Sequence, residues 1–444
     1  MMPRLGEGGA PPALPIGTLL MGALALLVGA AALLLNTDTL TAGVNSPTMV
    51  ALVHTFTLGF VGLIFAGTLQ QLPAVMFVTK LAWPGLGYVT TPALLLGSAA
   101  VIVGFASGFH PTWLQVGAVL TSLAWILLLA QLLATALKRP PKDAGSQALI
   151  LSVVFLTFTV VAGFLLASAR TSPGVAQAVG YPVRLHLTLG IFGAFLLGIV
   201  GSGQKLLSMF ALSKGGAQWR VRAAMLLITA ALVVESTEAF ARVSLGPLAL
   251  LLLAGGALMQ LLEVAAIHRR RLRKKLEAPI QRYVLAHAFM PLAGLLVLLD
   301  QPRAAAAAFL VGFVGLAVSG MLVKITSFLV WTAVFANARS GGVSGGAPLL
   351  RDLLRDELEP VTTWALAGGA LGLCITFVTG LPASATLTVL LLLVGAASQL
   401  AQVAHVVITT VRAGRSLNRP APAAPVRSAV MPELGPETSA EEAP

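Results

Sequence analysis

The sequence predicts an all-α integral membrane protein with twelve transmembrane helices, arranged as three pseudo-repeated units of four helices. Of its 444 residues, 57% are hydrophobic and only 10% are charged, whereas a soluble protein carries roughly 25% charged residues. Many apolar runs reach the roughly 20 residues that cross about 30 Å of hydrocarbon. A glycine pattern recurs three times along the chain. We therefore expect lipid to be the solvent of this chain and its helices to repeat.

The glycine pattern marks three helices that occupy equivalent places in the chain. Three glycines recur at one spacing without gaps, as Gly59, Gly62 and Gly67, then Gly190, Gly193 and Gly198, then Gly312, Gly315 and Gly320. Glycine is frequent in membrane helices, so a single spacing can recur by chance. Three ungapped matches, with Phe60 and Phe313 also aligned, indicate an internal repeat instead. A second pattern begins at Gln131, Gln260 and Gln399, and it also recurs every four helices.

The apolar runs give the order of the elements. We expect transmembrane helices at 14–36, 47–72, 90–108, 112–137, 147–169, 185–211, 221–241, 246–268, 283–299, 304–335, 361–379 and 384–411. The membrane domain, 13–412, then divides into repeats at about 13–140, 145–275 and 280–412. The polar N-terminus, 1–12, and the Pro-, Ala- and Glu-rich tail, 416–444, are predicted to be disordered.

The distribution of basic residues predicts the orientation. Only four of the 28 Lys and Arg residues fall on one side of the predicted membrane, namely Arg170, Arg184, Arg242 and Arg303. Because cytoplasmic loops are enriched in Lys and Arg, both termini are expected in the cytoplasm. The loop between the eighth and ninth helices holds a cluster of Arg269, Arg270, Arg271, Arg273, Lys274, Lys275 and Arg282. We interpret it as a solvated positive-inside loop, with binding of anionic lipids in the bilayer as the alternative, and expect no nucleic-acid partner.

The single cysteine, Cys374, lies inside an apolar run. One cysteine excludes an intrachain disulfide and any Cys-rich metal or iron–sulfur site.

Two of the six histidines are the main candidates for a binding site. His54 and His186 lie early in repeat-equivalent helices that enter from the outer side, so both are expected in the outer third of the membrane. An ionisable residue inside a span is a functional-site hypothesis by default, and neutral imidazole binds metal and heme iron. A hydrogen-bonded packing histidine is the alternative. His186 aligns with Thr55, so His54 is rotated by about 100° relative to it, and we expect the two to serve different neighbours.

Glu235 and Glu238 are a second candidate feature. They lie three residues apart on one face of the predicted helix 221–241, at a depth close to that of His186. Paired carboxylates there can coordinate a metal ion together with His186. Alternatively they pair with Arg184 or Arg242, which costs less at a helix end and which we favour.

Three motifs carry a resemblance to a known family. They are His54 with Gly67-Thr-Leu-Gln-Gln-Leu-Pro73, His186 with Gln204-Lys-Leu-Leu-Ser-Met-Phe210, and Lys324-Ile-Thr-Ser-Phe-Leu-Val-Trp331. Over residues 14–411 the chain resembles the heme-copper oxidase subunit I superfamily. More narrowly, it is similar to the small bacterial cytochrome c oxidase subunit I-like proteins near the NO-response membrane proteins of the NnrS type. The resemblance implies a multi-pass protein of the bacterial inner membrane.

The resemblance also implies ligands, and here the chain departs from the family. By position, His54 would be a heme ligand and His186 a metal ligand. The helix 221–241 has no histidine where the family has two copper ligands, and Ala307 and Ala308 stand where a heme ligand is expected. A heme ligated from the second and tenth helices, a three-histidine copper site and oxygen reduction are therefore not expected.

We therefore expect the protein to be a degenerate relative of the oxidases. It would bind at most one heme or metal ion near the outer side, for a response to a diatomic gas (NO or O₂) or for electron transfer, with an electron donor or another membrane subunit as partner. Two alternatives stay open at this point, a small-molecule transporter and a cofactor-free accessory or assembly subunit. Transporter repeats are commonly two and inverted, which fits three parallel repeats less well.

Overall fold

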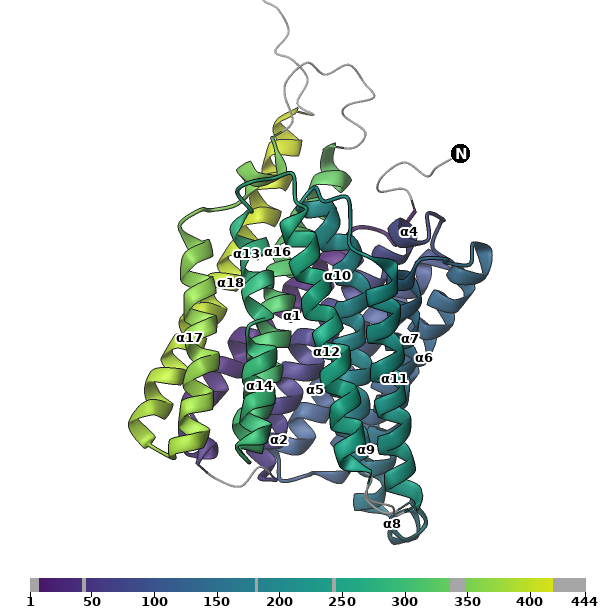
Figure 1. Cartoon of the computed structure of the whole chain (residues 1–444), viewed down its shortest axis with the longest axis vertical. Coiled ribbons are helices and arrows are strands. Elements are labelled where there is room, and N and C mark those ends of the chain that lie inside the picture. The colour runs from purple at the N-terminus through teal and green to yellow at the C-terminus, as the bar shows by residue number, and fades with distance from the viewer. Residues whose placement is uncertain (1–7, 42–44, 180–182, 242–244, 336–347, 418–444) are drawn as a thin grey trace, which may run out of the picture.

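Helix follows helix through the whole described part of the chain, which in this computed structural model comprises residues 8–41, 45–179, 183–241, 245–335 and 348–417 (Figure 1). Apart from one isolated bridge between Ser213 and Arg271, these residues form no β-structure. Eleven of the described helical segments are long and apolar enough to cross a membrane. The chain is therefore an all-helical, multi-pass membrane protein by length and composition.

The helices run along one common direction (Figure 1). The first four spanning segments are α1 (Ala13–Leu34), Pro47–Leu69, Pro84–Ala106, which contains α5 (Gly87–Ala106), and α6 (Pro111–Lys138). The next are α7 (Ala144–Thr171), Val183–Phe210 and α12 (Gly246–Arg269). The last are Ala278–Leu298, which contains α13 (Ala278–Ala286) and α14 (Phe289–Leu298), then Pro302–Phe335, α17 (Leu358–Thr379) and α18 (Pro382–Leu417).

Short elements join the spanning helices. They are η1 (Thr37–Leu40), α4 (Leu72–Met76), η3 (Pro84–Leu86), α8 (Pro173–Val179) and η7 (Leu350–Leu353). The helix α8 lies at one end of the bundle and α4 lies at the opposite end (Figure 1). These two ends are called the α8 end and the α4 end below.

The predicted seventh helix is present as α11 (Gln218–Ala241), which has 24 residues and packs on α12 and α7. It is not among the eleven apolar spans, because Arg220, Arg222, Glu235 and Glu238 make it more polar than its neighbours. The eleven segments otherwise fall at the predicted positions, with ends that differ by a few residues.

One shifted boundary changes the environment of a charged residue. The helix expected from residue 283 begins at Ala278, so Arg282 belongs to α13 and not to the preceding loop. Its side chain is completely buried. The expectation that Arg282 is part of the solvated basic loop is therefore wrong, since its charge is satisfied inside the bundle.

Each glycine repeat coincides with a π-helical stretch inside a longer helix. The stretches are η2 (Thr55–Gly62), between α2 (Pro47–His54) and α3 (Leu63–Leu69), η4 (Leu189–Leu196), between α9 (Val183–Thr188) and α10 (Leu197–Phe210), and η5 (Ala308–Gly315), between α15 (Pro302–Ala307) and α16 (Leu316–Phe335). A Cβ atom on Gly62 would lie 3.0 Å from the carbonyl oxygen of Thr57, five residues earlier. The widened turn thus favours glycine, and π-helical turns are rare and frequent at functional sites.

The three π-containing helices meet in the interior of the bundle. A Cβ on Gly315 would lie 3.2 Å from the ring of Phe56, and one on Gly198 would lie 3.1 Å from the ring of Phe65. The rings of Phe192 and Phe309 are 5.3 Å apart, centre to centre. Most residues in the apolar part of Pro302–Phe335 are buried, whereas most of those in α1 are not. Small residues therefore let these helices approach closely, as is usual in membranes.

The ends of the chain need one correction. Residues 8–12, which were predicted to be disordered, lie against the α4 region. The amide of Ala10 donates to Gln70 O at 2.9 Å, and the amide of Leu81 donates to Gly8 O at 2.7 Å. These backbone hydrogen bonds hold the segment in place. The other residues predicted to be disordered, 1–7 and 418–444, lie outside the described part of the chain.

Candidate functional site

A large apolar cavity lies between the helices and contains both candidate histidines. Its volume is about 810 Å³, and its lining comes from η2, α7, α9, η5, α17 and several other helices. Most of the lining side chains are aliphatic or aromatic, while His54, His186, Arg170 and Arg303 supply ionisable groups. An apolar pocket with a few polar groups is the usual form of a ligand site.

His54 is the last residue of α2, directly before the π-helical stretch η2. Its Nδ1 lies 2.8 Å from the carbonyl oxygen of Val50, one turn earlier. Because a carbonyl oxygen only accepts, Nδ1 carries the proton and Nε2 keeps its lone pair. The ring also packs against Phe105, with 4.5 Å between ring centres. The imidazole is therefore held in one orientation with an unprotonated Nε2.

His186 lies on α9 and is held in the same tautomer by a neighbouring helix. Its Nδ1 donates to the carbonyl oxygen of Thr159 on α7, at 2.9 Å. A Cβ on Gly163 would lie only 3.1 Å from the His186 ring, so the absence of a side chain at this position makes room for the imidazole. Among the described residues, no hydrogen bond reaches Nε2 of His54 or of His186. Both nitrogens are available to a ligand.

The two rings face each other inside the cavity. Their centres are 6.3 Å apart and their planes differ by 16°. His54 and His186 have different hydrogen-bond partners, as expected, but their rings lie beside each other in one cavity. The one-residue offset changes the direction in which the His54 side chain leaves its helix. The two helices occupy different positions in the bundle, however, so side chains that leave them in different directions can reach the same place.

The carboxylates predicted near His186 bind an arginine. Arg184 donates through Nη1 to Glu238 Oε1 at 2.9 Å and through Nη2 to Glu235 Oε1 at 3.0 Å. Ion pairing, the favoured alternative, is thus what the structure contains, while Arg242 lies outside the described residues. In the described ranges, no three or more His, Cys, Asp or Glu side chains are grouped to hold a metal ion.

His287 shows what a packing histidine looks like in this protein. Its Nδ1 donates to Tyr283 O at 2.9 Å, and its Nε2 lies 3.1 Å from Nε2 of Gln260, which donates to it. Both ring nitrogens of this buried residue are therefore satisfied by the protein itself. His54 and His186 differ, because each uses only one ring nitrogen.

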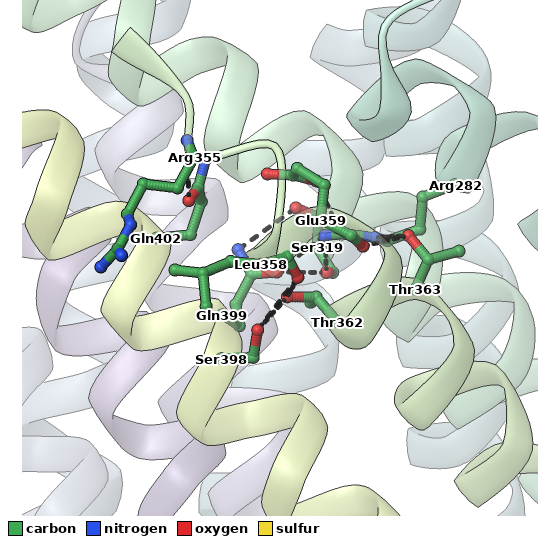
Figure 2. Close-up of polar contacts among 10 residues, drawn as sticks. All are labelled: Arg282, Ser319, Arg355, Leu358, Glu359, Thr362, Thr363, Ser398, Gln399 and Gln402. Carbon is green, nitrogen blue, oxygen red and sulfur yellow. Dashed lines mark hydrogen bonds and ion pairs between the residues drawn. The ribbon is translucent and has the colours of Figure 1, made fainter.

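A buried ionic cluster was missed by sequence reasoning (Figure 2). Arg282 donates to Glu359 Oε2 at 2.6 Å, to Gln399 Oε1 at 2.8 Å and to Ser319 Oγ at 2.9 Å. It also donates to Thr363 Oγ1 at 2.9 Å. We call these five residues the Arg282 cluster. Gln399, one of the repeated glutamines, was the signal available in the sequence.

The Arg282 cluster ties α13, α16, α17 and α18 together in the interior. Each guanidinium nitrogen donates to a side chain, and Nη2 donates to the backbone oxygen of Glu359 as well. A charge is tolerated away from water when it is paired and hydrogen-bonded in this way. It lies apart from the cavity, since none of its members lines it. We therefore interpret the cluster as a structural clamp.

Comparison with known proteins gives no family for this chain. No protein-family model matches it, and no curated protein is similar to it in sequence. The cavity and its two histidines are therefore the features that point to a function.

Proposed function

We propose that this protein is a heme-binding membrane protein in which the cavity that contains His54 and His186 is the heme site. One observation carries the proposal: two imidazoles in the same tautomer, each with an unused Nε2, face each other in one large apolar cavity. When bound, heme supplies one-electron exchange or binding of a diatomic gas. A role in electron transfer or in a response to NO or O₂ follows.

The residues present fit such a group. The volume of about 810 Å³ far exceeds what a bare ion needs and lies within the range of about 300–1,000 Å³ that ligand pockets occupy. The walls are mainly apolar, as a macrocycle requires. Arg170 and Arg303 line the same cavity, and arginine suits the carboxylate substituents of a ligand. Glu235 and Glu238 are engaged by Arg184, so we leave them out of the site.

The proposal includes an architecture of twelve spans in three units of four. The coincidence of each glycine repeat with a π-helical stretch supports the three units, and α11 supplies the twelfth span. The repeated glutamines Gln131, Gln260 and Gln399 are all buried, which also supports equivalence. We further propose a relationship to the heme-copper oxidase superfamily without its copper site, because the two histidines that the family has on the seventh helix are missing from 221–241.

Placement in the membrane follows from the charges. With Lys and Arg concentrated toward the α4 end, we propose that this end is cytoplasmic, that both termini lie there, and that the protein resides in the bacterial inner membrane. His54 and His186 would then lie near the outer side. An electron donor or a second membrane subunit is the partner that this role requires.

The test is an optical one on detergent-purified protein. We expect a heme Soret band and a pyridine hemochrome in the wild type and in His110→Ala, a control at an exposed histidine outside the cavity. We expect neither in the double variant His54→Ala/His186→Ala. A colourless wild-type protein from heme-replete cells would refute the proposal and favour a transporter or a cofactor-free subunit.

A further inference from the structure

We infer that His54 and His186 bind the same iron, one from each side, so that a single heme would be held between the first and second units of the chain. This inference rests on the proposed function, because it requires heme in the cavity. It goes further by assigning both axial positions. The sequence lacks the histidine on the tenth helix that would bind a heme together with His54 on the second helix. The structure instead brings His54 close to His186 on the sixth helix.

The first argument is the protonation of the two rings. Ligation through Nε2 requires a neutral imidazole with its proton on Nδ1. Val50 O and Thr159 O each accept a hydrogen bond from the adjacent Nδ1, at 2.8 and 2.9 Å. A backbone carbonyl is also the usual outer partner of a ligating histidine. Both side chains therefore carry the features of ligands, whereas His287 has no free ring nitrogen.

The second argument is the separation of the rings. With nitrogen–metal bonds of about 2 Å, two imidazoles bound to one ion from opposite sides have ring centres roughly 6 Å apart. The observed separation of the ring centres is 6.3 Å, and the planes are nearly parallel. If each histidine bound a separate ion, the distance between the ring centres would not have to agree with the distance expected for one shared ion.

The third argument is the support around the rings. Phe105 packs on His54, and Gly163 leaves room for His186. Each histidine also precedes a π-helical stretch, His54 directly and His186 by three residues. Orientation is thus fixed before any ligand arrives, which is what a precise ligand pair requires.

The consequence concerns chemistry. An iron with protein ligands on both sides has no open position for a gas. Between the two roles in the proposed function, the geometry therefore favours electron transfer over gas binding. In this reading Val50 and Thr159 are positioning residues that act through the histidines.

The experiment is electron paramagnetic resonance and optical spectroscopy of the purified full chain, with heme quantified by hemochrome. We expect the ferric wild type to be low-spin and the reduced form not to bind added CO. His54→Gly and His186→Gly should each lose the low-spin signal. Added imidazole should restore it in both variants, and far-UV circular dichroism should confirm that they remain folded.

The outcomes separate the inference from the proposed function. A high-spin wild type that binds CO, or a low-spin signal that survives His186→Gly, would overturn the shared ligation while leaving heme binding intact. A wild type without heme would overturn both. A low-spin signal lost in both variants and restored by imidazole would support the inference.

Discussion

At the scale of single residues, the backbone carbonyls decide what each histidine can do. His54, His186 and His287 all donate Nδ1–H to a carbonyl oxygen. Only His287 also receives a hydrogen bond at Nε2, from Gln260. The hydrogen bond from Gln260 therefore distinguishes His287, which only packs, from His54 and His186, which can bind a ligand. In the sequence all three are histidines within apolar runs.

Gly163→Ala should weaken ligation by His186. The new Cβ would lie 3.1 Å from Cε1 and 3.5 Å from Nδ1 of the ring, so the imidazole must shift by a few tenths of an ångström. We expect a lower heme-to-protein ratio, or a lower low-spin fraction, with little loss of stability, since alanine is favoured over glycine within a helix by roughly 0.5–1 kcal/mol.

The matched control is Gly294→Ala, a helical glycine in α14 with nothing within 4 Å of an added Cβ. Hemochrome assays of both variants, run beside the wild type, provide the measurement. Equal heme content and equal spectra in Gly163→Ala and Gly294→Ala would show that the room beside His186 is not needed.

At the scale of elements, buried polar groups connect helices that are far apart in the sequence. Arg282 on α13 joins Ser319 on α16, Glu359 on α17 and Gln399 on α18 (Figure 2). Such a clamp is costly to break, because removing one partner leaves a buried charge uncompensated. It fixes the packing of α13 against α16, α17 and α18, and α17 and α18 also contribute to the cavity wall.

Arg282→Met and Glu359→Met should each destabilise the protein strongly, by about 3–5 kcal/mol, because each leaves one buried ion without its partner. The double variant should lose clearly less than the sum of the two, since no unpaired charge remains. Cys374 is the only cysteine and is buried, so its reaction with a fluorogenic maleimide on heating reports unfolding.

The control is Arg351→Met, at a side chain that is 70% exposed and that, among the described residues, forms an ion pair with its neighbour Asp352 alone. It should leave the unfolding temperature nearly unchanged, as exposed ion pairs contribute about 0–1 kcal/mol. Strictly additive losses in the double variant would contradict a coupled buried pair.

At the scale of the whole molecule, the three π-containing helices lie in the interior and the cavity lies among them toward the α8 end. The proposed orientation places this end at the outer surface and both termini in the cytoplasm. This orientation is inferred from where the Lys and Arg residues lie along the chain, and not from the net charge of the protein. An outer-side site would bring the two histidines close to a donor outside the cytoplasm.

Reporter fusions test this orientation. A fluorescent protein fused after residue 444 should fluoresce in bacterial cells, whereas alkaline phosphatase at the same place should be inactive, because the former needs the cytoplasm and the latter the periplasm. Alkaline phosphatase fused after Gln301, between α14 and α15, should be active. Phosphatase activity at residue 444 and none at Gln301 would invert the proposed topology.

Local sequence patterns were enough to predict the helices and to single out the two histidines. Span length and apolar composition are local properties, so eleven segments fall where the runs predict, and the glycine repeats locate the π-helical stretches although not their π character. His54 and His186 stood out because an ionisable group is costly in a span. The more polar α11 was also predicted, from the apolar run at 221–241.

Only the tertiary structure decided which groups meet. Rotation about each helix axis could be read from the sequence, but the position of each helix in the bundle could not, and so the facing pair His54 and His186 was missed. The burial of Arg282 depends on four other residues that lie up to 117 positions away. Partnerships of this kind arise from packing between distant segments, which no local pattern encodes.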